Sequence, residues 1–145
     1  MTPEINQVIF GFLTTIDSPL LPHYLAVARS NNVTNIHVLC DSKLWSEKDH
    51  IIWRERTGGF LEAGVAENPT LYNLGSLKIP FYLVDSHNSE VTLAIIKQLR
   101  INCLFNAGTP RRVSARVLAS VKHGVVNVHP GLLPDYRGCS AVEWA

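Results

Sequence analysis

The sequence predicts an α/β fold of the Rossmann-like, doubly wound kind, built on a mostly parallel sheet. Short apolar runs such as residues 8–13 (VIFGFL) show no polar alternation, which is typical of strands buried on both faces. These runs alternate with segments of helical period, the pattern of right-handed βαβ units. The 145 residues are 46% hydrophobic and 17% charged, which indicates one domain with a real core and excludes a disordered chain.

Each predicted element has a local signal. The expected strands are residues 8–13, 35–40, 80–84, 104–106 and 125–128. The expected helices are residues 18–31, 46–57, 89–100 and 113–121. Asp17-Ser18-Pro19 predicts the first helix start, because a polar cap precedes a proline suited to the first turn. Ser46 and Asp49 resemble a capping box for the second helix. Residues 58–79 show no sustained period and are expected to form a loop.

Several classes of function are disfavoured by what the sequence lacks. Gly11 is followed by FLTTID rather than by a glycine-rich turn, and no GxxxxGK[ST] loop is present, so neither standard nucleotide site is expected. A net charge of +1 is small for a nucleic-acid module. No apolar run is long enough for a membrane span, and no secretory signal is recognisable. Three separated cysteines predict a cytoplasmic protein, with Cys40 and Cys103 buried as small apolar residues.

The chemistry of the chain is concentrated near its end. Asn127 and His129 stand two apart on an expected strand, so their side chains point to one face at its carboxyl end. An amide donor beside an imidazole can stabilise an oxyanion and move a proton. Pro130, Gly131 and Pro134 predict a rigid loop beside the pair. The alternative is structural: a hydrogen-bonded histidine and an asparagine that caps a turn.

Residues 127–138, NVHPGLLPDYRG, resemble the signature N-x-H-[PGA]-[SG]-L-L-P-x-[YWF]-[RKP]-G of the formyltransferase family. That family includes methionyl-tRNA, glycinamide ribonucleotide and amino-sugar formyltransferases. Residues 106–113 (NAGTPRRV) resemble the family segment that follows the fourth strand. The resemblance implies an enzyme of one-carbon metabolism that transfers a formyl group from 10-formyltetrahydrofolate to an amine, with no metal.

The resemblance also implies roles for individual residues. Asn127 would donate a hydrogen bond to the oxyanion of the tetrahedral intermediate, and protonated His129 would stabilise the same charge and relay a proton. Backbone at Arg111, Arg112 and Val113 would contact the folate, although the arginine side chains could instead be a solvated helix start. The substrate loop would comprise Pro130, Gly131, Leu132, Leu133, Pro134, Tyr136, Arg137 and Gly138.

One departure from the family keeps alternatives open. The family's catalytic aspartate would fall beyond Ala145, so residues 1–145 are expected to be an N-terminal formyltransferase domain that is C-terminally incomplete. An uncovered strand edge would favour a homodimer. The alternatives are a non-catalytic folate-binding module and a 10-formyltetrahydrofolate hydrolase. The acceptor is expected to be a small-molecule amine, with an amino-sugar nucleotide preferred, and neither a nucleic acid nor a membrane is expected as partner.

Overall fold

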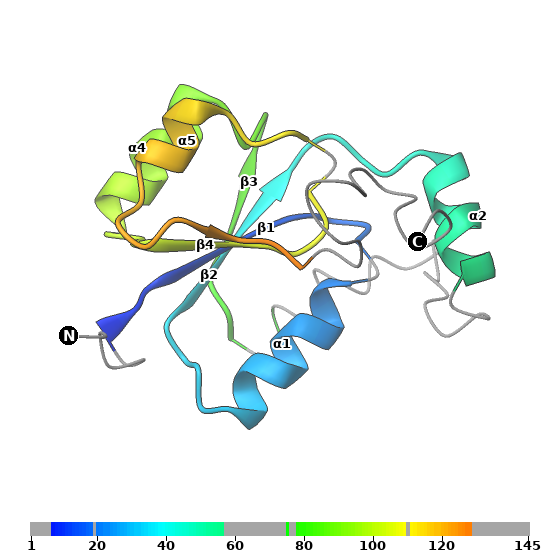
Figure 1. Ribbon diagram of the computed structural model, residues 1–145, viewed down its shortest axis with the longest axis horizontal. Coiled ribbons are helices and arrows are strands. Elements are labelled where there is room, and N and C mark those ends of the chain that lie inside the picture. The colour runs from blue at the N-terminus through cyan, green and yellow to red at the C-terminus, as the bar shows by residue number, and fades with distance from the viewer. Residues whose placement is uncertain (1–6, 19, 57–74, 76–77, 110, 129–145) are drawn as a thin grey trace, which may run out of the picture.

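A computed structural model gives the fold and describes residues 7–18, 20–56, 75, 78–109 and 111–128. Its centre is a five-stranded sheet in the order β3-β2-β1-β4-β5, with every neighbouring pair parallel. The strands are β1 (Phe10–Thr15), β2 (Ile36–Asp41), β3 (Phe81–Val84), β4 (Cys103–Asn106) and β5 (Val125–Val126). The predicted α/β fold with a parallel sheet is therefore confirmed (Figure 1).

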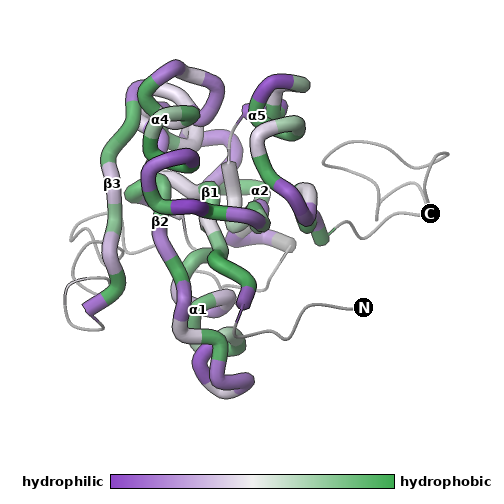
Figure 2. Tube along the Cα trace, turned by 90° about the vertical axis from the view of Figure 1, so that its left-hand side faces the viewer, coloured by the Kyte–Doolittle hydropathy of each residue, from purple (hydrophilic) through white to green (hydrophobic). Residues whose placement is uncertain are grey.

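Helices cover both faces of this sheet. The helices are α1 (Leu21–Ser30), α2 (Glu47–Arg56), α4 (Glu90–Gln98) and α5 (Ala115–Ala119). Figures 1 and 2 show α1 on one side of the sheet and α4 with α5 on the other. The core is accordingly split into one cluster under α1, around Phe12 and Leu25, and a second under α4 and α5, around Leu13 and Ile96.

Strand β1 lies at the centre and is buried on both sides, as the unbroken apolar run predicted. Phe12 packs in the α1 cluster, whereas its neighbour Leu13 packs in the α4/α5 cluster. Successive side chains of a strand point to opposite faces, so an apolar residue is needed at every position. The strand runs from Phe10 to Thr15, two residues later than expected, and even Thr14 and Thr15 are fully buried.

The predicted start of the first helix is wrong. Helix α1 begins at Leu21, with Pro22 in its first turn and no side-chain cap. The polar residues expected to cap it are engaged elsewhere: the Ser18 hydroxyl donates to Ala107 O over 3.2 Å, and the Asp17 carboxylate accepts from Trp45 N over 2.9 Å. Tertiary hydrogen bonds have taken the place of the local cap.

Two other helix starts behave as local sequence rules require. At α2, Asp49 N donates to Ser46 Oγ over 3.1 Å and Ser46 N donates to Asp49 Oδ2 over 3.2 Å, so the capping box is confirmed. Helix α5 is capped by Ser114 and is shorter than predicted. The three valines at its expected i, i+4 and i+8 positions still pack in one core cluster: Val113, Val117 and Val121.

The structure also settles two smaller expectations. Cys40 and Cys103 are free and buried, as predicted, and burial raises the pKa of the Cys40 thiol to about 12. Cys139 lies outside the described residues. Within the described segments, no helix has the length and apolar character needed to cross a bilayer.

Candidate functional site at the carboxyl edge of the sheet

The strand order identifies where a ligand would bind. The chain passes from β1 to β2 and β3 on one side, then returns to place β4 and β5 on the other, so the order reverses between β1 and β4. In open α/β sheets, ligands bind at the carboxyl ends of the strands next to such a reversal. Polar side chains end the strands there: Thr15 of β1, Asp41 of β2 and Asn106 of β4.

The loop that follows β4 is anchored to this edge from three directions. Thr14 Oγ1 donates to Ala107 O over 2.9 Å. Ser18 Oγ donates to the same carbonyl, and the Trp45 indole Nε1 donates to Gly108 O over 3.0 Å. Gly108 has φ of +96°, and a Cβ there would lie 2.6 Å from Ser18 Oγ. The loop therefore passes so close to its neighbours that only glycine fits.

We expect Gly108→Ala to destabilise the protein more than Gly124→Ala. Both glycines have positive φ, at +96° and +77°, but a Cβ at Gly124 would meet nothing within 4 Å. Gly124→Ala therefore introduces backbone strain alone, about 1–3 kcal/mol, whereas Gly108→Ala adds overpacking of a similar size. Urea unfolding of both variants measures the difference, and equal losses would show that the close approach at Gly108 is unimportant.

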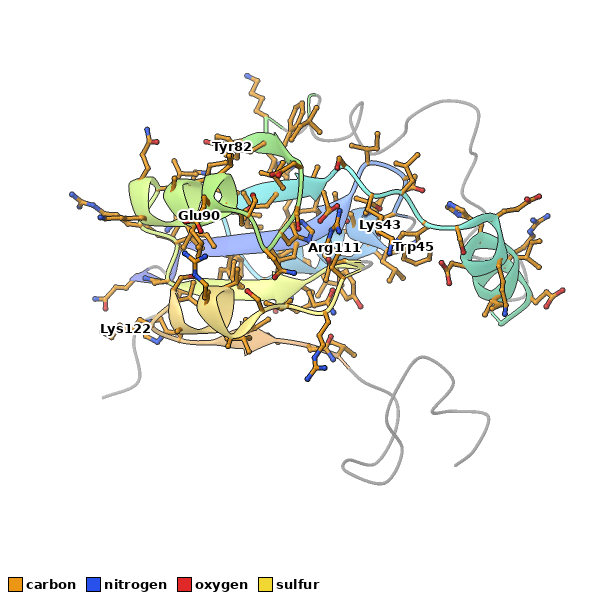
Figure 3. All side chains as sticks on the ribbon, turned by 90° about the horizontal axis from the view of Figure 1, so that it is seen from above. Lys43, Trp45, Tyr82, Glu90, Arg111 and Lys122 are labelled. Carbon is orange, nitrogen blue, oxygen red and sulfur yellow. The ribbon has the colours of Figure 1, made fainter. Side chains whose placement is uncertain are left out.

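An ion pair joins the end of β2 to the same loop. Arg111 Nε lies 2.6 Å from Asp41 Oδ2, and an Arg111 terminal amino group donates to Asp85 O over 3.2 Å. Burial by itself would raise the pKa of Asp41, but hydrogen bonds from Arg111, Lys43 N and His87 N hold that pKa below its ordinary value. Figure 3 shows Lys43, Trp45 and Arg111 gathered in one region, away from Lys122. Arg111 is thus a structural link rather than a solvated side chain.

A buried histidine that the sequence analysis missed completes this network. His87 is fully buried, and its Nε2 lies 2.8 Å from Leu39 O. A carbonyl only accepts, so Nε2 carries the proton, and Nδ1 accepts from the Thr109 hydroxyl over 2.6 Å. The signal in the sequence was the polar segment Asp85-Ser86-His87 directly after an apolar strand. Its burial, however, depends on residues far away in the chain.

The protein is expected to lose stability as the pH falls below about 6.5. Burial lowers the pKa of His87 below its ordinary value of 6.5, and it lowers that of His37 in the same way. Between the folded-state pKa values and pH 6.5, these histidines bind protons in the unfolded chain but not in the folded protein. The free energy of unfolding is therefore highest above pH 6.5 and falls as the pH drops toward the folded-state pKa values. Urea unfolding at pH 7.5 and pH 5.5 checks the sign. Ring ¹⁵N titration separates the two residues, and an unfolding free energy that rises on acidification would contradict the expectation.

The residues expected to contact folate lie on a backbone segment that is held firmly. Asn88 Nδ2 donates to Arg112 O over 3.0 Å, and Asn88 Oδ1 accepts from Ser114 N over 2.7 Å. The Arg112 side chain is exposed, and Val113 is partly buried against the α4/α5 cluster. Asn88 and the Asp41–Arg111 pair therefore fix residues 111–114 before any ligand binds.

The prediction that residues 125–128 form one strand is wrong in its last part. Strand β5 comprises only Val125 and Val126, and Asn127 follows it as an exposed residue. Pairing stops there because β4 ends at Asn106, whose Oδ1 accepts from the backbone N–H of Gly108 and of Thr109 and so turns the chain. His129 and the predicted substrate loop, residues 130–138, lie outside the described residues.

Asn127 nevertheless lies at the candidate site. Asn106 Nδ2 donates to Asn127 Oδ1 over 2.6 Å, which joins the ends of β4 and β5 beside the reversal of strand order. Thr109 N donates to Asn106 Oδ1, and Arg111 N donates to Thr109 Oγ1, so hydrogen bonds connect Asn127 indirectly to the Arg111 backbone. Within the described segments, no three histidine, cysteine or acidic side chains are grouped so as to hold a metal ion.

The strand order defines a Rossmann-like α/β protein, and the polar edge at the carboxyl ends of its strands is its candidate ligand site. The chain belongs to the formyl transferase family, whose model matches residues 65–145. Two methionyl-tRNA formyltransferases are similar in sequence. That of Thermotoga maritima is 29% identical over 79 residues, which are 54% of this chain and 25% of that protein. That of Listeria monocytogenes is 35% identical over 69 residues, or 48% and 22%.

Solved structures resemble the fold over nearly the whole chain. Phosphoribosylglycinamide formyltransferase from Anaplasma phagocytophilum superposes with a TM-score of 0.60 at 20% identity, covering 95% of this chain and 57% of that one. Glycinamide ribonucleotide transformylase 1 from Symbiobacterium toebii gives 0.59 at 13% identity, covering 94% and 58%. The chain thus spans about a quarter of the length of each methionyl-tRNA formyltransferase and just under three-fifths of the length of each solved structure.

Proposed function

We propose that residues 1–145 form the formyl-donor part of an active site that transfers a formyl group from 10-formyltetrahydrofolate to an amine. The position of Asn127 carries the proposal. This exposed amide follows β5 at the carboxyl edge of the sheet, beside the reversal of strand order. It is also the first residue of the NVHPGLLPDYRG segment, which falls within the family match.

The proposed roles follow from the chemistry of each group. The bound donor supplies the formyl carbon that the amine attacks. Asn127 donates a hydrogen bond to the oxyanion that develops, and His129 stabilises that charge. His129 also relays the proton from the attacking amine to the folate nitrogen, whose bond to the formyl carbon breaks so that tetrahydrofolate leaves. The backbone at residues 111–113 receives the donor. Hydrogen bonds to Asn88 and Asp41 already hold this segment, which suits that role because less conformational entropy is then lost on binding.

For the acceptor we propose a small-molecule amine, with amino-sugar nucleotides as the first class to test. The sequence relatives are named for methionyl-tRNA and the structural relatives for a ribonucleotide amine. A net charge of +1 gives little general attraction to a polyphosphate backbone. The segment after β1 does not form a glycine-rich phosphate loop. Its Ser18 hydroxyl donates a hydrogen bond to Ala107 O, and its Asp17 carboxylate accepts one from Trp45 N.

The test is an assay of the native protein, purified from its source cell, with 10-formyltetrahydrofolate and a panel of amines. Tetrahydrofolate release is followed by absorbance and formylated products by mass spectrometry. Release that depends on an amine and yields the formylated amine supports the proposal. Release of formate without an amine would instead identify a hydrolase. Calorimetric binding without turnover would identify a folate-binding module, and absence of binding would contradict a folate-dependent function altogether.

A further inference from the structure

We propose that Asn106 is a positioning residue that holds the side-chain amide of Asn127 with its NH₂ group free to donate toward substrate. The inference rests on the proposed function of Asn127 and adds a second residue to it. Its evidence is a set of connected hydrogen bonds from the backbone of Gly108 and Thr109 to Asn106 and from Asn106 to Asn127. In each of them, the identity of one atom as donor or acceptor determines the identity of the atom that faces it.

Two backbone N–H groups fix the orientation of the Asn106 side-chain amide. Its Oδ1 lies 3.1 Å from Gly108 N and 3.0 Å from Thr109 N. Both partners are backbone N–H groups, which can only donate, so the atom facing them must be the amide oxygen. The Asn106 NH₂ group therefore occupies the other end of the side chain.

The Asn106 amide in turn fixes the orientation of the Asn127 amide. The Asn106 NH₂ nitrogen lies 2.6 Å from the end of the Asn127 amide, and a donor at that distance requires an acceptor. The facing atom is therefore Asn127 Oδ1. Among the described residues, none accepts a hydrogen bond from Asn127 Nδ2, so the NH₂ group is the end of this amide that is turned away from Asn106.

The Asn127 amide needs a positioning residue because its surroundings do not otherwise fix its orientation. Asn127 is exposed, so close packing does not choose between the two flipped orientations of its amide. One orientation presents a donor to a developing oxyanion, and the other presents an oxygen that would repel it. The register places the two asparagines side by side: Leu104 pairs with Val125 and Phe105 with Val126, so Asn106 and Asn127 come next.

Asn106→Asp separates positioning from folding. A carboxylate still accepts from the N–H groups of Gly108 and Thr109, so the turn after β4 is retained. It cannot donate to Asn127 Oδ1, however, and it attracts the Asn127 NH₂ group instead. The amide then flips and turns its oxygen toward substrate. We expect kcat to fall about 10²-fold, with a much smaller change in the KM for the formyl donor.

A double-mutant cycle shows whether Asn106 acts through Asn127. If it does, Asn106→Asp combined with Asn127→Ala is no slower than Asn127→Ala alone. Wild-type kcat in Asn106→Asp would overturn the proposal, and so would a double variant whose loss is the product of the two single losses. Unfolding free energies of all variants confirm that each rate is measured on folded protein.

Side-chain amide NMR of the wild type and Asn127→Ala tests the positioning without any assay of activity. One Asn106 NH₂ proton is expected to exchange slowly in the wild type and to lose that protection in Asn127→Ala. Unchanged protection would overturn the positioning. Absence of formyl transfer by the wild type, with the expected NMR change, would instead refute the proposed function and leave the positioning intact.

Discussion

Asn127→Ala is expected to lower kcat for formyl transfer by about 10²-fold or more, the usual loss when one oxyanion donor is removed. The substitution deletes the Asn127 NH₂ group at the carboxyl edge of the sheet. The fold should persist, because Asn127 is exposed and contributes no apolar burial. Steady-state kinetics with the formyl donor and the identified acceptor measure the effect. The KM for the donor is expected to change little, since the lost bond strengthens only in the transition state.

Val128→Ala is the matched control for this variant. Val128 follows Asn127 directly and is 64% exposed, so its truncation disturbs the same backbone without removing a polar group. We expect a kcat close to that of the wild type. Equal losses in the two variants would mean that activity depends on the local chain path, and an unchanged kcat in Asn127→Ala would remove Asn127 from the mechanism.

Asp41→Ala is expected to destabilise the protein by about 3 kcal/mol. The carboxylate is fully buried and accepts hydrogen bonds from Lys43 N, His87 N and Arg111 Nε. Without the Asp41 carboxylate, the backbone N–H of His87 is left buried and unpaired. The Arg111 side chain is 30% exposed and can regain water, which keeps the loss at the lower end of the range for a broken buried pair. Urea unfolding followed by tryptophan fluorescence measures it.

Glu90→Ala serves as the comparison for Asp41→Ala. Glu90 also pairs with an arginine, Arg116, but the two side chains are 75% and 66% exposed. Exposed pairs contribute little because water screens the charges and two long side chains must be ordered. We expect almost no change in the unfolding free energy. If Glu90→Ala cost as much as Asp41→Ala, burial would not explain the importance of the Asp41–Arg111 pair.

Loss of Asp41 should also affect the site. Asp41 is one of the anchors of the loop after β4, whose later residues are proposed to receive the formyl donor. At a temperature where Asp41→Ala remains folded, a weaker affinity for the donor is therefore expected. Calorimetry on the wild type and the variant measures that change, and an unchanged affinity would show that Asn88 alone suffices to hold residues 111–114.

Elements whose signals are local could be predicted from the amino-acid sequence alone. Unbroken apolar runs identified the buried strands because a parallel strand covered on both faces needs an apolar residue at every position. The capping box of Ser46 and Asp49 was predictable for the same kind of reason, since both partners lie within one helical turn. The motif at residues 127–138 indicated the family in the same way, as a contiguous string.

The contacts between distant polar groups, by contrast, depend on the tertiary fold. Asp41 and Arg111 are 70 positions apart, and His87 binds Leu39 across 48 positions. These contacts exist because parallel strands bring their carboxyl ends to one edge, and no spacing within the sequence encodes their register. The start of α1 differs from the predicted start for the same reason. Ser18 and Asp17 form hydrogen bonds with distant residues, Ala107 and Trp45, instead of capping the helix.

The candidate site shows the same division. The sequence identified Asn127 as a chemically suitable amide, but it could not tell which way that amide faces. The orientation depends on Asn106, which lies 21 positions earlier and is itself oriented by the turn after β4. The identity of residue 127 as asparagine provides an NH₂ donor. The direction in which this donor points depends on hydrogen bonds that form only when β4 and β5 lie side by side.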